Sequence, residues 1–175
     1  LRSLVGSEMC IRDRFNAAQK LFDSGRKSSI AFFSLEMSSE QLLQFRRFKA
    51  SMVFQKFALL PHRSVAQNAA YGLTIQGVDA GEALERSQRW LERVGLGGFE
   101  KHFPAQLSGG MQQRVGLARA LATDAEILLM DEPFSALDPL IRRQLQKEFI
   151  KLSKQLKKTT VFITHDLDEA VKVGH

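Results

Sequence analysis

The segment that most constrains this chain is residues 107–133, LSGGMQQRVGLARALATDAEILLMDEP. It begins with a serine and two glycines ahead of a helical pattern, and it closes with an apolar strand pattern that runs into two carboxylates. A strand that is apolar on both faces is typical of the interior of a parallel sheet, and ligands bind at the carboxyl ends of such strands. The segment therefore predicts an α/β fold with a binding site where Asp131 and Glu132 follow a central strand.

The paired carboxylates indicate metal and water chemistry. Asp131 is suited to hold Mg²⁺, usually through water, because this ion prefers hard oxygen ligands. Glu132 can orient or activate an attacking water molecule. A polar turn after a strand is the alternative interpretation of the two residues taken alone, and the motifs around them count against it.

A second candidate site lies at the start of the helical pattern, in LSGGMQQR. Ser108 can offer its hydroxyl group to a phosphate, while Gly109 and Gly110 let the backbone come close. The helix N-terminus adds a positive dipole that favours an anion. An ordinary glycine-containing helix start is the alternative, but the eight-residue string is more specific than a loose glycine pattern.

Three further polar residues stand where strands or helices begin or end. Gln55 ends the strand pattern ASMVFQ and can reach a metal ion or water, although glutamine is common after strands. His165 ends the buried strand pattern TTVFIT, where it can contact a γ-phosphate, although a lone histidine is more often structural. Asp138, in SALD, reads as the N-cap of a long helix that Pro139 opens. We expect Gln55, Asp131 and His165 at neighbouring ends of parallel strands.

The charge distribution argues against a nucleic-acid partner. The net charge is +6, of which +4 falls in residues 1–50 and only +2 in the rest of the chain. The basic stretch KEFIKLSKQLKK carries apolar residues at helical spacing, so its lysines form the solvated face of an amphipathic helix. The single cysteine, Cys10, fits a reducing compartment, and the apolar runs are too short to span a membrane.

Residues from about 45 to 175 resemble the ATP-binding subunit of ABC transporters. Five motifs carry the resemblance in the family's order: Gln55 for the Q-loop, LSGGMQQR for the signature, ILLMDEP for Walker B, SALD for the D-loop and His165 for the H-loop. The sequence around these motifs, such as MVFQKFALLPHRSVAQNAAYGL, looks closest to that of the ATP-binding subunits of importers for glycine betaine, proline and related quaternary amines. Polar amino acid importers read similarly.

The resemblance implies a truncated P-loop NTPase fold, with a RecA-like parallel sheet and a helical subdomain at about 64–122. It implies ATP and Mg²⁺ as cofactors, a head-to-tail dimer with a second nucleotide-binding subunit, permease subunits in the membrane, and a substrate-binding protein acting indirectly. The subunit would be peripheral, on the cytoplasmic face of the plasma membrane. The implied roles are catalysis for Glu132 and His165, metal binding for Asp131 and Gln55, and nucleotide binding for Gln55, Ser108, Gly109, Gly110 and Asp138. Among these, Ser108, Gly109 and Gly110 would act on the partner's nucleotide.

A phosphate loop of the form G-x-x-x-x-G-K-[ST] does not occur in these 175 residues. The nearest string is DSGRKSS, at 23–29, where Lys20 stands in place of the first glycine. Without the glycines, backbone N–H groups cannot converge on phosphates, so this string reads as a turn. The polypeptide is therefore predicted to be inactive as an ATPase.

The first 44 residues do not resemble the front of an ABC domain. Residues 15–44 resemble a fragment of the replicative, hexameric DNA helicases, in which Glu36 matches the catalytic glutamate, and residues 1–14 resemble translated sequencing-adapter DNA. The chain reads as a chimera of three pieces, with poor packing expected for 1–14. The strand pattern SIAFFSL is expected to pair with an open edge of the sheet. The alternatives are a natural ABC protein with a divergent N-terminal region, a helicase-like ATPase, and a fragment without function.

Overall fold

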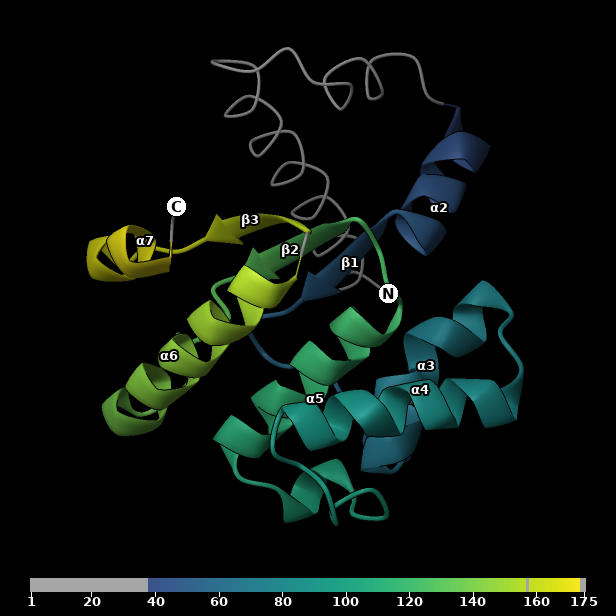
Figure 1. Cartoon of the computed structure of the whole chain (residues 1–175), viewed down its shortest axis with the longest axis horizontal. Helices are drawn as coiled ribbons and strands as arrows, with labels where there is room; N and C mark the ends of the chain where they lie inside the picture. The colour runs from purple at the N-terminus through teal and green to yellow at the C-terminus, as the bar shows by residue number, and fades with distance from the viewer. Residues whose placement is uncertain (1–37, 157, 174–175) are drawn as a thin grey trace, which may run out of the picture. The chain divides into compact units, whose positions relative to one another are not determined.

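The computed structural model describes residues 38–156 and 158–173 (Figure 1). The chain divides into two compact units, Leu1–Leu43 and Gln44–His175, and helix α2 (Ser39–Phe48) crosses that division. The adapter-like stretch, Glu36 and the strand pattern SIAFFSL lie outside the described residues. The expected boundary between 44 and 45 and the pairing of SIAFFSL therefore stay predictions.

The second unit is built on a parallel sheet, as expected. Its three strands are β1 (Ala50–Val53), β2 (Ile127–Asp131) and β3 (Thr159–Ile163), in the order β1-β2-β3. All pairings are parallel, so the carboxyl ends of the three strands lie at one edge of the sheet. This arrangement confirms the α/β fold. It also brings the residues that follow the strands to the edge of the sheet where the candidate site lies.

The central and outer strands differ in burial. β2 is buried along almost its whole length, which confirms the prediction from its apolar sequence. The prediction that TTVFIT is also buried was wrong: Thr159 and Thr160 are exposed and the rest of β3 is half-buried. Among the described strands, β3 lies at the edge of the sheet and pairs only with β2. An edge strand has a neighbouring strand on one side only, which leaves its side chains more exposed than those of β2.

Helices fill the chain between β1 and β2. They are α3 (Val65–Gln76), α4 (Ala80–Arg93), the short 3₁₀ helix η2 (Pro104–Gln106) and α5 (Gly109–Ala122). Figure 1 shows α3, α4 and α5 gathered below the strands in the view. They lie within the range of about 64–122 where a helical subdomain is expected, and the subdomain itself stays a prediction.

Local sequence signals explain where these helices begin and end. Ser64 forms a full capping box with Gln67 at the start of α3. Asp79 caps α4 by accepting hydrogen bonds from the backbone of Gly81 and Glu82. Gly95, with φ of 74°, follows the end of α4 in the left-handed conformation that glycine tolerates.

Two helices follow β2 and β3. Asp138 caps α6 (Pro139–Gln155), whose apolar stripe buries Leu145 and Phe149 against the sheet core, as the spacing predicts. The seven-residue α7 (Leu167–Val173) ends the described chain. Among the described residues, no helix is both long and apolar enough to cross a membrane.

Asp166 and Glu169, at the start of α7, form only half of a capping box. Asp166 accepts hydrogen bonds from the backbone of Asp168 and Glu169, as an N-cap does. The Glu169 carboxylate instead accepts from Gln146 of α6 and from Thr164. Burial explains the difference, because a buried carboxylate needs partners that reach it inside the protein.

Candidate active site at the strand ends

Glu132 is held in an unusual backbone conformation directly after β2. Its φ is 43°, a left-handed value that few residues other than glycine adopt. Its backbone N–H donates to the carbonyl of Ile163 at 2.9 Å, which ties the residue to the end of β3. Strain of this kind clusters at functional sites and costs on the order of 1 kcal/mol or more. The strained backbone therefore indicates that the Glu132 carboxylate is the centre of the site.

Gln55 and His165 both contact the Glu132 side chain. The Gln55 amide Nε2 donates to Glu132 Oε2 at 2.8 Å, and His165 Nε2 lies 2.7 Å from Oε1. Gln55 follows β1 and His165 follows β3, so the three strand ends converge, as expected from parallel order. The Glu132 side chain is 12% exposed, whereas that of His165 is 86% exposed. The cluster is thus a half-buried carboxylate with an imidazole open to solvent.

Asp131 lies next to this cluster and is buried at the last position of β2. The described residues contain no group of three or more His, Cys, Asp or Glu side chains that could enclose a metal ion. A magnesium ion held by one or two protein groups together with water and phosphate fits this donor set. The family resemblance assigns the metal to Asp131 and Gln55, whose carbonyl oxygen has no hydrogen bond within the described residues, and this role stays a prediction.

The signature residues lie at the beginning of α5, separate from the Glu132 cluster. Ser108 is the N-cap of α5, and its Oγ accepts from the backbone N–H of Met111 at 3.3 Å. Within the described chain, no hydrogen bond joins Ser108 to Gln55, Glu132 or His165. This placement is compatible with a role toward the nucleotide of another subunit, which stays a prediction.

Gly110 also has a packing role that the sequence did not reveal. A Cβ at this position would lie 2.7 Å from Ile141 Cγ2, and one at Gly109 would lie 3.7 Å from Leu137 Cδ2. Real Cβ atoms essentially never approach as closely as the first distance. Glycine at position 110 therefore lets α5 approach α6. No spacing rule predicts this contact, because α5 and α6 are separated in the sequence by the strand β2 and meet only in the folded protein.

Asp138 serves as a helix cap in this structure. Its Oδ1 accepts from the backbone N–H groups of Leu140 and Ile141, each at 3.1 Å. The expected cap is present, and the nucleotide-binding role that the family resemblance implies stays a prediction.

Arg119 is a residue of the site region that the sequence analysis missed. It is 9% exposed, and its guanidinium donates to the carbonyls of Ala58 (2.7 Å) and Phe57 (2.9 Å), just beyond Gln55. Phe57 and Ala58 have φ of 59° and 46°, so both are in the left-handed region. Burial lowers the pKa of Arg119 from its usual value. The sequence did carry one signal for this residue: Arg119 is the one charged residue in the apolar run LARALA, which indicates a buried arginine that needs partners.

We predict that Arg119→Met lowers the free energy of unfolding by about 1–3 kcal/mol, because it removes the buried guanidinium that donates to two part-buried backbone carbonyls. Urea unfolding of the purified chain measures this change. Arg89→Met is the matched control, since Arg89 is an exposed arginine whose ion-pair partner among the described residues is Glu85 on the same helix. Equal losses in the two variants would contradict the assigned role of Arg119.

Comparison with known proteins shows the family to which this chain belongs. The family model described as ABC transporter matches residues 20–135, and the chain belongs to this family. The match begins ahead of the boundary expected near residue 45, within the stretch that resembles a helicase fragment.

The similar curated proteins are ATP-binding proteins of transport systems. The chain is 60% identical over 138 residues to the glycine betaine transport ATP-binding protein OpuAA of Bacillus subtilis, which covers 79% of this chain and 33% of that protein. It is 52% identical over 139 residues to the glycine betaine/proline betaine protein ProV of Escherichia coli, covering 79% and 35%. It is 50% identical over 140 residues to the trimethylamine N-oxide protein TmoW of Pelagibacter ubique, covering 80% and 41%. The chain thus spans well under half of each relative.

Solved structures support the same fold. The dimeric post-hydrolysis state of the ATP-binding cassette MJ0796, bound to ADP and Pi, has a TM-score of 0.67 and 35% identity, covering 78% of this chain and 61% of that chain. Another dimeric structure of the same cassette has a TM-score of 0.68 and 34% identity, covering 79% and 62%. These matches confirm the prediction of a truncated P-loop NTPase core.

Proposed function

We propose that this chain is part of the ATP-hydrolysing subunit of an ABC importer for glycine betaine, proline betaine and related compatible solutes. The observation that carries the proposal is the convergence of Gln55, Glu132 and His165 at the carboxyl edge of the parallel sheet. The similarity to OpuAA and ProV supports the class of transported solute.

The geometry suits Glu132 to general-base chemistry. An ionised carboxylate has about four lone-pair positions, and Gln55 and His165 occupy one each. The remaining positions can accept a proton from a water molecule that attacks a γ-phosphate. The protein must hold that water in line, because phosphoryl transfer depends mainly on positioning and charge.

His165 and Gln55 position the base. His165 is exposed on its outer side, so its ring can turn from Glu132 toward a phosphate oxygen without crossing the core. Gln55 fixes the second carboxylate oxygen through its Nε2 and leaves its own carbonyl oxygen for a metal-bound ligand. Mg²⁺, held with the help of Asp131, would neutralise charge on the β- and γ-phosphates.

The proposed partners follow from the site's incompleteness within one chain. Ser108 and the N-terminus of α5 offer an anion site that lies apart from the Glu132 cluster, so a second nucleotide-binding subunit would bring its own signature to this nucleotide. The dimeric state of the cassette MJ0796 supports the pairing of two such subunits. Permease subunits and, through them, a substrate-binding protein complete the proposed importer on the cytoplasmic face of the plasma membrane.

An uptake experiment tests the proposed function. Residues 45–175 are joined to the front part of OpuAA, and the product replaces OpuAA in a Bacillus subtilis strain that lacks it. We expect restored uptake of radiolabelled glycine betaine, which the additional change Glu132→Gln abolishes. A stable hybrid that hydrolyses ATP but leaves uptake at the level of the deletion strain would contradict the proposed importer class.

A further inference from the structure

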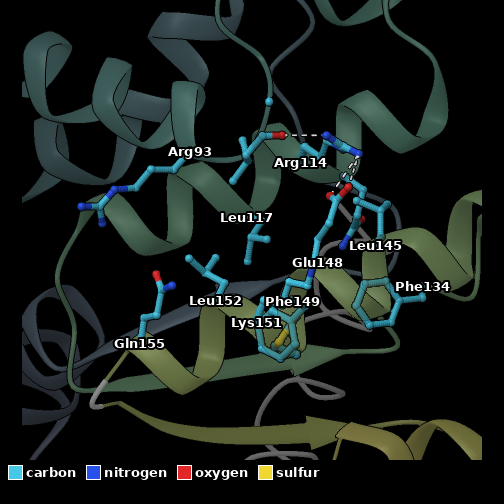
Figure 2. Close-up of a pocket in the computed structure, with 14 residues that line it drawn as sticks. Arg93, Arg114, Leu117, Phe134, Leu145, Glu148, Phe149, Lys151, Leu152 and Gln155 are labelled. Atoms are coloured by element: carbon cyan, nitrogen blue, oxygen red, sulfur yellow. Dashed lines mark hydrogen bonds and ion pairs between the residues drawn. The ribbon is translucent and has the colours of Figure 1, made fainter.

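A cavity of about 330 Å³ opens between the end of α4, the face of α5 and the C-terminal half of α6 (Figure 2). Its floor and walls are mainly apolar, and Figure 2 shows Leu117 of α5 and Leu152 of α6 reaching into it from opposite sides. Phe134 and Phe149 close one end with an edge-to-face ring contact of 6.4 Å between centroids. The volume falls within the lower range of small-molecule sites in proteins.

Gln113 gives the cavity a polar group without a protein partner. The residue is 3% exposed, it lines the cavity, and its side-chain oxygen has no hydrogen bond within the described chain. A buried amide without a partner costs on the order of 1–3 kcal/mol. Most such groups in native proteins are paired. The unpaired Gln113 atom is an oxygen that accepts hydrogen bonds and has almost no accessible surface, so the apolar walls and the charged rim define the ligand instead.

The charges at the rim favour an anion. Arg114 is committed, because it donates to the carbonyl of Val94 at 2.9 Å and pairs with Glu148 at 3.0 Å. Arg93 stacks over the Trp90 ring at 4.9 Å and has no acidic partner in the described residues. Lys151 likewise lines the cavity without a recorded ion pair in that part of the chain. With Glu148 neutralised, the rim carries an excess of positive charge.

We propose that this cavity binds a small amphipathic anion, with an apolar ring or short alkyl body and one carboxylate or sulfonate group. The body would fill the space between Leu117 and Leu152, and the anionic group would lie at the rim near Lys151 and Arg93. None of the cavity's lining residues belongs to the Gln55, Glu132 and His165 cluster, so the site is separate from the proposed hydrolytic centre.

The experiment uses octanoate as the anionic probe and octylamine as a cationic probe of matched length. Isothermal titration of the purified chain is expected to show saturable binding of octanoate and at least about tenfold weaker binding of octylamine. Lys151→Gln should weaken octanoate about tenfold, the typical effect of losing one charge-assisted contact. Lys147→Gln is the matched control, because Lys147 is an exposed lysine of the same helix that does not line the cavity.

Leu117→Trp provides a second variant that fills the cavity without changing charge. We expect it to abolish octanoate binding while a thermal melt shows that the chain still unfolds cooperatively. Equal affinity for octanoate and octylamine, or equal weakening by Lys151→Gln and Lys147→Gln, would overturn the proposal. Absence of saturable octanoate binding to the unmodified chain would overturn it as well. None of these readouts requires ATP hydrolysis, so they are independent of the proposed function.

Discussion

The purified 175-residue polypeptide is expected to release phosphate from millimolar Mg-ATP at least about a hundredfold more slowly than an intact cassette ATPase. Asp131 and Glu132 can place metal and water, but they cannot hold a polyanion. That task belongs to a phosphate loop, whose backbone donors and lysine stabilise the β- and γ-phosphates, and no such loop occurs in this sequence.

The expected loss is large because several donors are missing together. Removing a single oxyanion donor typically costs about 3–4 kcal/mol in the transition state, although such losses do not add simply. Pairing of two copies does not restore the site, since each copy has the same sequence. Phosphate release is measured against a Glu132→Gln control. Turnover close to that of an intact cassette, abolished by this control, would contradict the prediction.

The second large effect is expected in a hybrid that contains the missing loop. When residues 1–44 are exchanged for a cassette front carrying G-x-x-x-x-G-K-[ST], Glu132→Gln is expected to reduce phosphate release by about a hundredfold to a thousandfold. The amide keeps the shape and the contacts to Gln55 and His165 but accepts no proton. His165→Ala should reduce turnover as well, because Glu132 then loses its contact at Oε1.

Binding separates a chemical defect from a folding defect in these hybrids. The Glu132→Gln hybrid is expected to gain thermal stability from Mg-ATP as the unsubstituted hybrid does, because a ligand that binds the native state stabilises it. A Glu132→Gln hybrid that binds Mg-ATP and retains full turnover would contradict the assignment of the base.

The sequence predicted the fold well where pattern and topology determine the outcome. The apolar run of β2 identified a central strand, and parallel order then brought Gln55 and His165 to Glu132 from strand ends far apart in the sequence. The spacing of α6 likewise predicted which of its faces is buried. These features depend on local periodicity and on a small number of topological rules.

Features that depend on tertiary contacts could not be predicted in this way. The left-handed conformation of Glu132 and the contact of Gly110 with Ile141 arise from the packing of distant elements. The same holds for Arg119, whose partners are backbone carbonyls with no sequence signature. The half-exposed state of β3 reflects its position in the described sheet, which the composition of TTVFIT does not reveal.

The central claim is that Glu132, held by Gln55 and His165, is the base of an ATPase site that needs a phosphate loop from outside these residues. Steady-state phosphate release by three proteins tests it directly: the 175-residue chain, the hybrid with a phosphate loop, and the same hybrid with Glu132→Gln. We predict turnover only in the unsubstituted hybrid. Equal turnover by the two hybrids, or substantial turnover by the chain alone, would contradict the claim.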